Sequence, residues 1–229
     1  MELPKILGGE AVRKKPFPKW PIFDEREKEF LLQALESGRW GVGGKLQGEF
    51  EKKFADFQDA KHALLCSSGT TALKIALKAL GISPGDEVII PAYTFIGTAI
   101  AVLDLHAKII YADISLETCT IDIESVKNKI TEKTKVIIPV HFAGRPADMD
   151  AVREFAEEKN LSILEDAAQA HGAEWKNRRV GAIGDAGAFS FQSSKNITAG
   201  EGGAITTDDD KLASIAWSLR NVGRPRGGP

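Results

Sequence analysis

The chain has 229 residues and a formal net charge of -2, with 43% hydrophobic and 27% charged residues. These values are typical of a folded protein with a substantial core, and they exclude fibrous and mainly disordered classes. The nearly balanced charge gives no electrostatic footprint for nucleic acid, so we expect no nucleic-acid partner.

Cysteines and targeting signals are sparse. The two cysteines, Cys66 and Cys119, have no metal-ligand spacing and form no disulfide framework. The N-terminus lacks the basic and apolar regions of a secretory signal. The longest uncharged stretch, residues 88–103, contains Pro91 and Tyr93 and is too short to span a membrane. We therefore expect a cytoplasmic protein without a membrane partner.

The chain begins with a segment rich in proline and lysine. Residues 1–22 are expected to form an arm without regular structure, because prolines recur between residues 16 and 21. Apolar residues at helical spacing then predict a surface helix that is capped by Asp24 and ends near Gly38. Residues 39–44 form a loop before a second helix over residues 46–57. The domain prediction is an arm, 1–22, and a large domain, 23–229.

The rest of the chain alternates short apolar runs with helical patterns. Strands are predicted over 63–66, 87–90, 108–112, 135–140 and 162–164, and helices over 70–80, 95–103, 123–129 and 149–159. Strands over 186–191 and 203–206 and a helix over 208–220 follow. The pattern predicts an α/β fold with a mostly parallel sheet flanked by helices. Ligands of such sheets bind at the carboxyl ends of the strands.

The turn Ser67-Ser68-Gly69-Thr70 follows one predicted strand and opens a helix. Backbone N–H groups at a helix N-terminus bind anions, so this turn is a candidate phosphate site. The alternative is that Ser68 or Thr70 only caps the helix.

Asp166 follows another strand, where its carboxylate could pair with the ring nitrogen of a flat cofactor. The alternative is a strand-end residue that caps the next turn. Gln169 could donate to a phenolic oxygen, or it is a surface glutamine. His171 could belong to the same site, or it is a satisfied structural histidine.

Lys195 follows Ser190 in a small, polar loop, with Gly200, Gly202 and Gly203 behind it. A lysine that bonds a carbonyl cofactor needs such a sheltered place, whereas most lysines are solvated charges. Phe95 could cover a cofactor ring, or it is a core residue of the following helix. A lysine, an acid and hydroxyl groups are the set that pyridoxal 5'-phosphate requires.

Together these segments closely resemble the DegT/StrS family of sugar and cyclitol aminotransferases, from about Trp40 to the last residue. The resemblance implies a pyridoxal 5'-phosphate enzyme with the aspartate-aminotransferase fold. It implies that Lys195 bonds the cofactor, Asp166 pairs with its ring nitrogen and Gln169 contacts its phenolic oxygen. The remaining cofactor-binding residues that it implies are Phe95 on the ring and Ser68, Gly69, Thr70 and Ser190 at the phosphate.

The resemblance also implies a reaction. Glutamate or glutamine gives an amino group that is transferred to a keto group of a nucleotide-linked sugar or a cyclitol, and Lys195 moves the proton. A branch of the family has histidine at the lysine position and dehydrates sugars, and Lys195 argues against that branch. A homodimer is expected, because residues 40–44 resemble a loop that borders the neighbouring subunit's pocket.

Members of the family are longer than this chain and carry a small C-terminal domain. The chain ends at Pro229, so we expect that domain to be missing. The alternative function is therefore a truncated, catalytically incompetent protein that binds the cofactor or regulates a partner.

Overall fold

The computed structural model describes residues 4–225, and their contacts form two compact units that divide between Gly38 and Arg39. The first unit contains a 3-10 turn, Lys5–Leu7, and helix α1, Glu25–Glu36. Asp24 starts α1 with a capping box, because its side chain accepts from Arg26 and its N–H donates to Glu27 at 2.7 Å.

The 3-10 turn departs from the expectation of an arm without regular structure. It ends at Gly8, whose φ of 91° lies in the left-handed region, and it precedes the prolines between residues 16 and 21 that interrupt regular hydrogen bonding. The boundary between an arm, 1–22, and a large domain, 23–229, stays a prediction.

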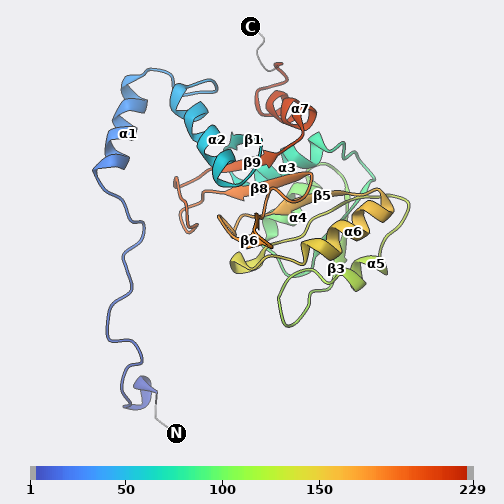
Figure 1. The fold of residues 1–229 in the computed structure, drawn as a ribbon, viewed down its shortest axis with the longest axis horizontal. Helices are drawn as coiled ribbons and strands as arrows, with labels where there is room; N and C mark the ends of the chain where they lie inside the picture. Colours follow the sequence, from blue (N-terminus) through green and yellow to red (C-terminus); the bar gives the residue numbers. More distant parts are fainter. Residues whose placement is uncertain (1–3, 226–229) are drawn as a thin grey trace. The chain divides into compact units, whose positions relative to one another are not determined.

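The second unit contains a seven-stranded sheet in the order β1-β9-β8-β5-β4-β2-β3 (Figure 1). Its strands are β1 (His62–Cys66), β2 (Glu87–Pro91), β3 (Lys108–Ala112), β4 (Thr134–Ile137), β5 (Ser162–Asp166), β8 (Ala186–Ser190) and β9 (Gly203–Thr207). Strand β9 is antiparallel to both of its neighbours, and the other pairs are parallel. The predicted α/β fold with a mostly parallel sheet is confirmed.

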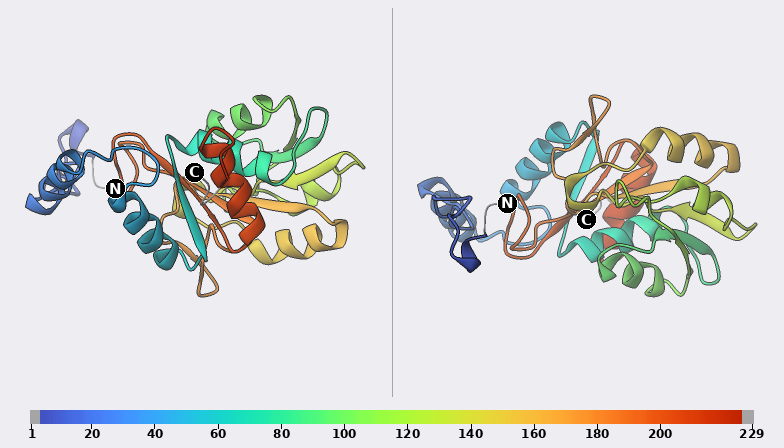
Figure 2. Two further views of the ribbon diagram at one scale, coloured as in Figure 1. Left: turned by 90° about the horizontal axis from the view of Figure 1, so that it is seen from above. Right: turned by 90° about the horizontal axis from the view of Figure 1, so that it is seen from below.

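Helices cover both faces of this sheet (Figure 2). One face carries α2 (Lys45–Phe57), α5 (Ile123–Lys127) and α6 (Met149–Lys159), and the other carries α3 (Gly69–Ala79), α4 (Ile96–Leu103) and α7 (Asp210–Arg220). Successive strand residues point to opposite faces, so both faces need apolar side chains. This explains why the strands are nearly continuous apolar runs.

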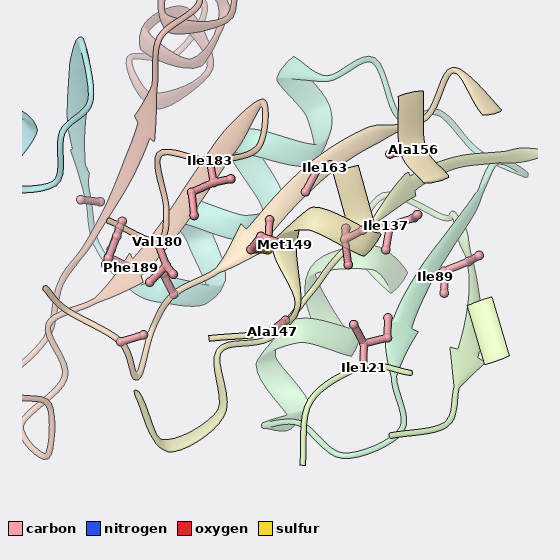
Figure 3. Close-up of a cluster of buried hydrophobic side chains, with 14 of the residues drawn as sticks. Ile89, Ile121, Ile137, Ala147, Met149, Ala156, Ile163, Val180, Ile183 and Phe189 are labelled. Atoms are coloured by element: carbon pink, nitrogen blue, oxygen red, sulfur yellow. The ribbon is translucent and has the colours of Figure 1, made fainter. Parts of the chain in front are cut away.

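Two hydrophobic clusters form the core, one on each face of the sheet. In the inner strand β4, Ile137 joins the cluster beneath α6, and its neighbour Val136 joins the cluster beneath α3 and α4. Figure 3 shows Met149, at the start of α6, beside Ile163 of β5. Burying one such side chain fully contributes about 1.5–3 kcal/mol.

The end of β5 and a short hairpin also differ from the sequence prediction. Asp166 is the last residue of β5 rather than a loop residue behind it. A short hairpin of β6 (Glu174–Trp175) and β7 (Arg178–Arg179) was not predicted, because two-residue strands show no periodicity. Its turn residues, Lys176 and Asn177, both have positive φ, which is the type I′ geometry of tight hairpins.

Across residues 4–225, every helix is too short or too polar to cross a lipid bilayer.

Candidate functional site

The carboxyl ends of β1 and β8 meet at the start of β9. Gly203 is the first residue of β9 and is paired with Cys66 on one side and with Ser190 on the other. Since β9 runs in the opposite direction, its first residue lies at the edge where its neighbours end. The turn over residues 67–69 and the side chain of Ser190 therefore lie at one edge of the sheet.

Glycine is needed where this turn packs against the sheet. A Cβ atom at Gly69 would lie 2.8 Å from the Ser190 Cβ, and one at Gly203 would lie 2.4 Å from the Ser68 carbonyl oxygen. Both distances are too short for packed atoms. Because these two residues have no side chain, the turn over residues 67–69 can pack directly against Ser190 and β9.

Ser68 caps helix α3. Its side-chain oxygen accepts a hydrogen bond from the N–H of Thr71 at 3.1 Å. Ser68 therefore caps the helix, and its role at a phosphate stays a prediction. The N–H groups of Gly69 and Thr70 precede the first hydrogen bond within the helix, so they remain available to an anion.

Asp166 is a buried acid at the end of β5, 5% exposed. Its carboxylate accepts from the Thr98 hydroxyl at 2.7 Å and from the Ala168 N–H at 3.2 Å. Burial raises the pKa of Asp166, and these hydrogen bonds and the nearby Lys195 ammonium oppose the shift. No ion pair reaches Asp166 from residues 4–225. The side chain has the environment of an acid that a cation would stabilise.

Gln169 lies in the turn that follows β5. Its side-chain oxygen accepts from the Ala143 N–H at 2.9 Å, which leaves the amide nitrogen to donate elsewhere. An open pocket of about 310 Å³ lies beside it. The pocket is lined by Ala143, Gly144, Gln169, His171, Ser194, Lys195 and Asn196.

Lys195 is half-buried in this pocket. Its backbone N–H donates to the Gln192 carbonyl at 2.9 Å, which closes a tight turn just after β8. Within the described part of the chain, its ammonium group forms no ion pair. These features differ from those of a solvated surface lysine.

His171 shares the pocket, and its ring packs against Phe189 and Phe191 with centroids 5.5 and 5.8 Å away. Both of its ring nitrogens are buried, and neither has a partner at hydrogen-bond geometry among residues 4–225. Burial lowers the pKa of His171 to about 4, although the nearby Ser190 backbone opposes the shift. His171 is thus a buried ring at the pocket, and its part in the site stays a prediction.

Phe95 is 67% exposed and occupies the N-cap position of α4. A Cβ atom at Gly97 would meet both the Phe95 ring, at 3.0 Å, and the Thr70 hydroxyl, at 2.7 Å. Phe95 and Thr70 therefore flank the same glycine. The alternative that Phe95 is a core residue is wrong.

The structure thus gathers most of the predicted residues in three groups. Gln169 and Lys195 line one pocket, Ser68 and Gly69 pack on Ser190, and Thr70 lies beside Phe95. Asp166, Ser190 and Phe95 do not line the pocket itself.

Sequence reasoning missed Thr98, which bonds Asp166, and His141, which bonds Glu165. The one available signal for Thr98 is its position four residues after Thr94, one helical turn away. The two hydroxyls do bond, at 2.8 Å.

The chain is similar to known aminotransferases. Residues 21–228 match the model of the DegT/DnrJ/EryC1/StrS aminotransferase family. The L-glutamine:2-deoxy-scyllo-inosose aminotransferase of Streptomyces lividus is 40% identical, over 96% of this chain and 53% of that protein. GDP-perosamine synthase of Caulobacter vibrioides is 43% identical, over 89% of this chain and 55% of that protein.

Among solved structures, 3-amino-5-hydroxybenzoic acid synthase superimposes with a TM-score of 0.90 at 42% identity, covering 93% of this chain and 56% of that one. The chain therefore spans about half the length of the relatives it matches. Its helices and strands superimpose on the fold of this enzyme, as the sequence predicted. The chain belongs to the DegT/DnrJ/EryC1/StrS aminotransferase family.

Proposed function

We propose that the protein is a pyridoxal-phosphate-dependent aminotransferase that moves an amino group from glutamate or glutamine to a keto group of a nucleotide-linked sugar or a cyclitol. The observation that carries the proposal is Asp166, a buried carboxylate without an ion pair among residues 4–225, close to the half-buried Lys195. The related enzymes named above act on substrates of both classes.

The residues present fit the cofactor. A pyridinium nitrogen beside Asp166 would supply the cation that this buried carboxylate lacks, and it would favour the charged form of the acid. The amide nitrogen of Gln169 is available to donate to the phenolic oxygen. The Gly69 and Thr70 N–H groups and the Ser190 hydroxyl lie at one helix N-terminus, which suits a phosphate.

When bound, pyridoxal phosphate supplies an electron sink for the carbon that gains or loses the amine. The protein side chains bind, orient and move protons. Lys195 Nζ would bond the cofactor, and after its release it would carry the proton as a general base and acid. Phe95 would cover one face of the ring, since it is exposed beside Thr70.

The test is turnover by the purified protein. The wild type, supplied with pyridoxal phosphate and L-glutamine or L-glutamate, is expected to aminate a keto-cyclitol or a nucleotide-linked keto-sugar, and the Lys195→Ala variant is not. A protein that holds the cofactor but loses no visible absorbance with any amino donor would instead be the incompetent, cofactor-binding alternative. A protein that never acquires visible absorbance would contradict both functions.

We also propose that the protein is a homodimer. Ile96, Ile100 and Leu103 of α4 are 60%, 40% and 55% exposed, and their spacing places them on one face of the helix. An apolar stripe next to Phe95 and the candidate site supports pairing with a second copy. Light scattering tests this: the mass of a dimer is expected, and Ile100→Lys should lower it to that of a monomer.

A further inference from the structure

We propose that His141 and Glu165 form a buried positioning pair that holds Asp166 and Gln169 in place for the cofactor. The His141 Nε2 and Glu165 Oε2 atoms are 2.9 Å apart, and both side chains are 0% exposed. The inference rests on the proposed function, but it concerns two residues outside the pocket lining.

Glu165 is the hydrogen-bond acceptor of this pair. Its carboxylate accepts from the backbone N–H groups of Gly181 at 2.8 Å and of Ile183 and Gly184 at 2.7 Å. Burial alone would raise the pKa of Glu165, but the hydrogen bond and the electrostatic attraction of His141, together with the backbone hydrogen bonds, hold the pKa below its usual value. Glu165 is thus a buried carboxylate that accepts from the His141 ring and from three backbone N–H groups.

The hydrogen bonds also define the tautomer of His141. The Ala147 N–H donates to His141 Nδ1 at 3.1 Å, so Nδ1 carries no proton. The proton is on Nε2, which donates to Glu165. One ring therefore ties the segment after β4 to β5 and, through Glu165, to the turn before β8.

The backbone of the same segment clamps Asp166. The His141 N–H donates to the Asp166 carbonyl at 3.1 Å, and the Asp166 N–H donates to the Pro139 carbonyl at 2.9 Å. Both the backbone N–H and the carbonyl group of Asp166 are therefore hydrogen-bonded to this segment. Since Glu165 precedes it in β5, the buried pair and the clamp fix adjacent residues of one strand end.

Gln169 depends on the same segment. Two residues after His141, the Ala143 N–H donates to the Gln169 side-chain oxygen at 2.9 Å. Ala143 has a φ of 51°, in the left-handed region that residues other than glycine seldom adopt, so surrounding contacts must hold this turn in place. The hydrogen bonds of the His141 ring to Glu165 and Ala147 supply such contacts. A shift of about 1 Å in such supporting groups can cost about 100-fold in rate.

The test compares two substitutions of His141. In His141→Gln the side-chain amide can still reach Glu165 and donate, whereas in His141→Asn the shorter side chain keeps an acceptor for Ala147 but cannot reach Glu165. The matched control is Ile89→Ala, which makes a cavity in the hydrophobic cluster beneath α6 and touches none of these hydrogen bonds. Each protein is titrated with pyridoxal phosphate, and its visible absorbance is followed against pH.

We expect His141→Asn to weaken cofactor binding about tenfold or more and to shift the pH midpoint of the visible band. His141→Gln should restore most of both properties. Ile89→Ala should unfold at a lower temperature and keep the wild-type midpoint. A His141→Asn protein that matches Ile89→Ala in affinity and midpoint would overturn the positioning role, although the wild-type band would still support the proposed function.

Two further measurements test the inference if the His141→Asn variant does not fold. Glu165→Gln removes the charge at nearly constant volume, and it should shift the midpoint as His141→Asn does. In the unaltered protein, the nuclear magnetic resonance signal of the His141 Nε2 proton should move when cofactor is added. A signal that stays in place would contradict the inference, and a wild type without any visible band would contradict the proposed function as well.

Discussion

The Thr98 hydroxyl donates a hydrogen bond of 2.7 Å to the Asp166 carboxylate, and both side chains are buried. This bond joins helix α4 to the end of β5, which belong to different layers of the fold. It is also one of the interactions that oppose the effect of burial on the pKa of Asp166. The charge state of the acid is therefore sensitive to a single hydroxyl.

Thr98→Val removes this hydroxyl and keeps the shape of the side chain. The pKa of Asp166 should rise further, because the buried carboxylate loses a donor. We expect the free energy of unfolding to fall by about 1–3 kcal/mol and the affinity for pyridoxal phosphate to fall about tenfold. Absorbance titration and denaturant unfolding measure the two effects. Thr98→Ser keeps the donor, so an equal loss in both variants would argue against the hydrogen bond as the cause.

Gly203→Ala tests the contact between β9 and the turn before α3. The added Cβ would lie 2.4 Å from the Ser68 carbonyl oxygen, so the turn must move. Overpacking of this kind costs about 1–3 kcal/mol of stability, and it should also weaken phosphate binding at Gly69 and Thr70.

Gly48→Ala is the matched control for that substitution. A Cβ at Gly48 meets nothing within 4 Å, and the residue lies inside helix α2. Alanine should stabilise this helix by about 0.5–1 kcal/mol. Equal thermal midpoints for the two variants would show that the close approach at Gly203 has no energetic consequence.

His171 gives a prediction about pH. Its pKa falls from 6.5 in the unfolded chain to about 4 in the folded protein, mainly because it is buried. Between these values the unfolded state binds more protons, so stability is complete above pH 6.5 and is lost as the pH falls toward 4. The loss amounts to about 3 kcal/mol at most.

The measurement is denaturant unfolding of the wild type and of His171→Phe between about pH 4 and pH 7. The phenylalanine ring can keep the packing on Phe189 and Phe191, but it does not titrate. Its stability should therefore fall less than that of the wild type as the pH is lowered. Parallel curves for the two proteins would show that His171 does not carry this dependence.

The sequence was sufficient to predict a mostly parallel sheet and the order of its strands and helices along the chain. An apolar run such as the one over β2 indicates a strand that is buried on both faces of the sheet. Capping residues such as Asp24 and Ser68 indicate where helices begin. The reversed direction of β9 brings Gly203 between Cys66 and Ser190, and no local pattern encodes that pairing.

The site was predictable in part. Residues that follow strands, such as Gln169, could be assigned to one edge of the sheet. The partners of Asp166 and Glu165 could not, because Thr98 and His141 come from segments 68 and 24 residues away in the chain. A buried histidine and a surface histidine look alike in sequence, and only tertiary packing distinguishes His141 and His171 from the others.

Reductive trapping tests the central role of Lys195 most directly. The protein is mixed with pyridoxal phosphate, reduced with borohydride and digested, and the modified peptide is identified by mass spectrometry. The predicted result is one stoichiometric modification at Lys195, which is absent from Lys195→Ala. Modification spread over several surface lysines, or a Lys195→Ala protein that is labelled as fully as the wild type, would contradict the assignment.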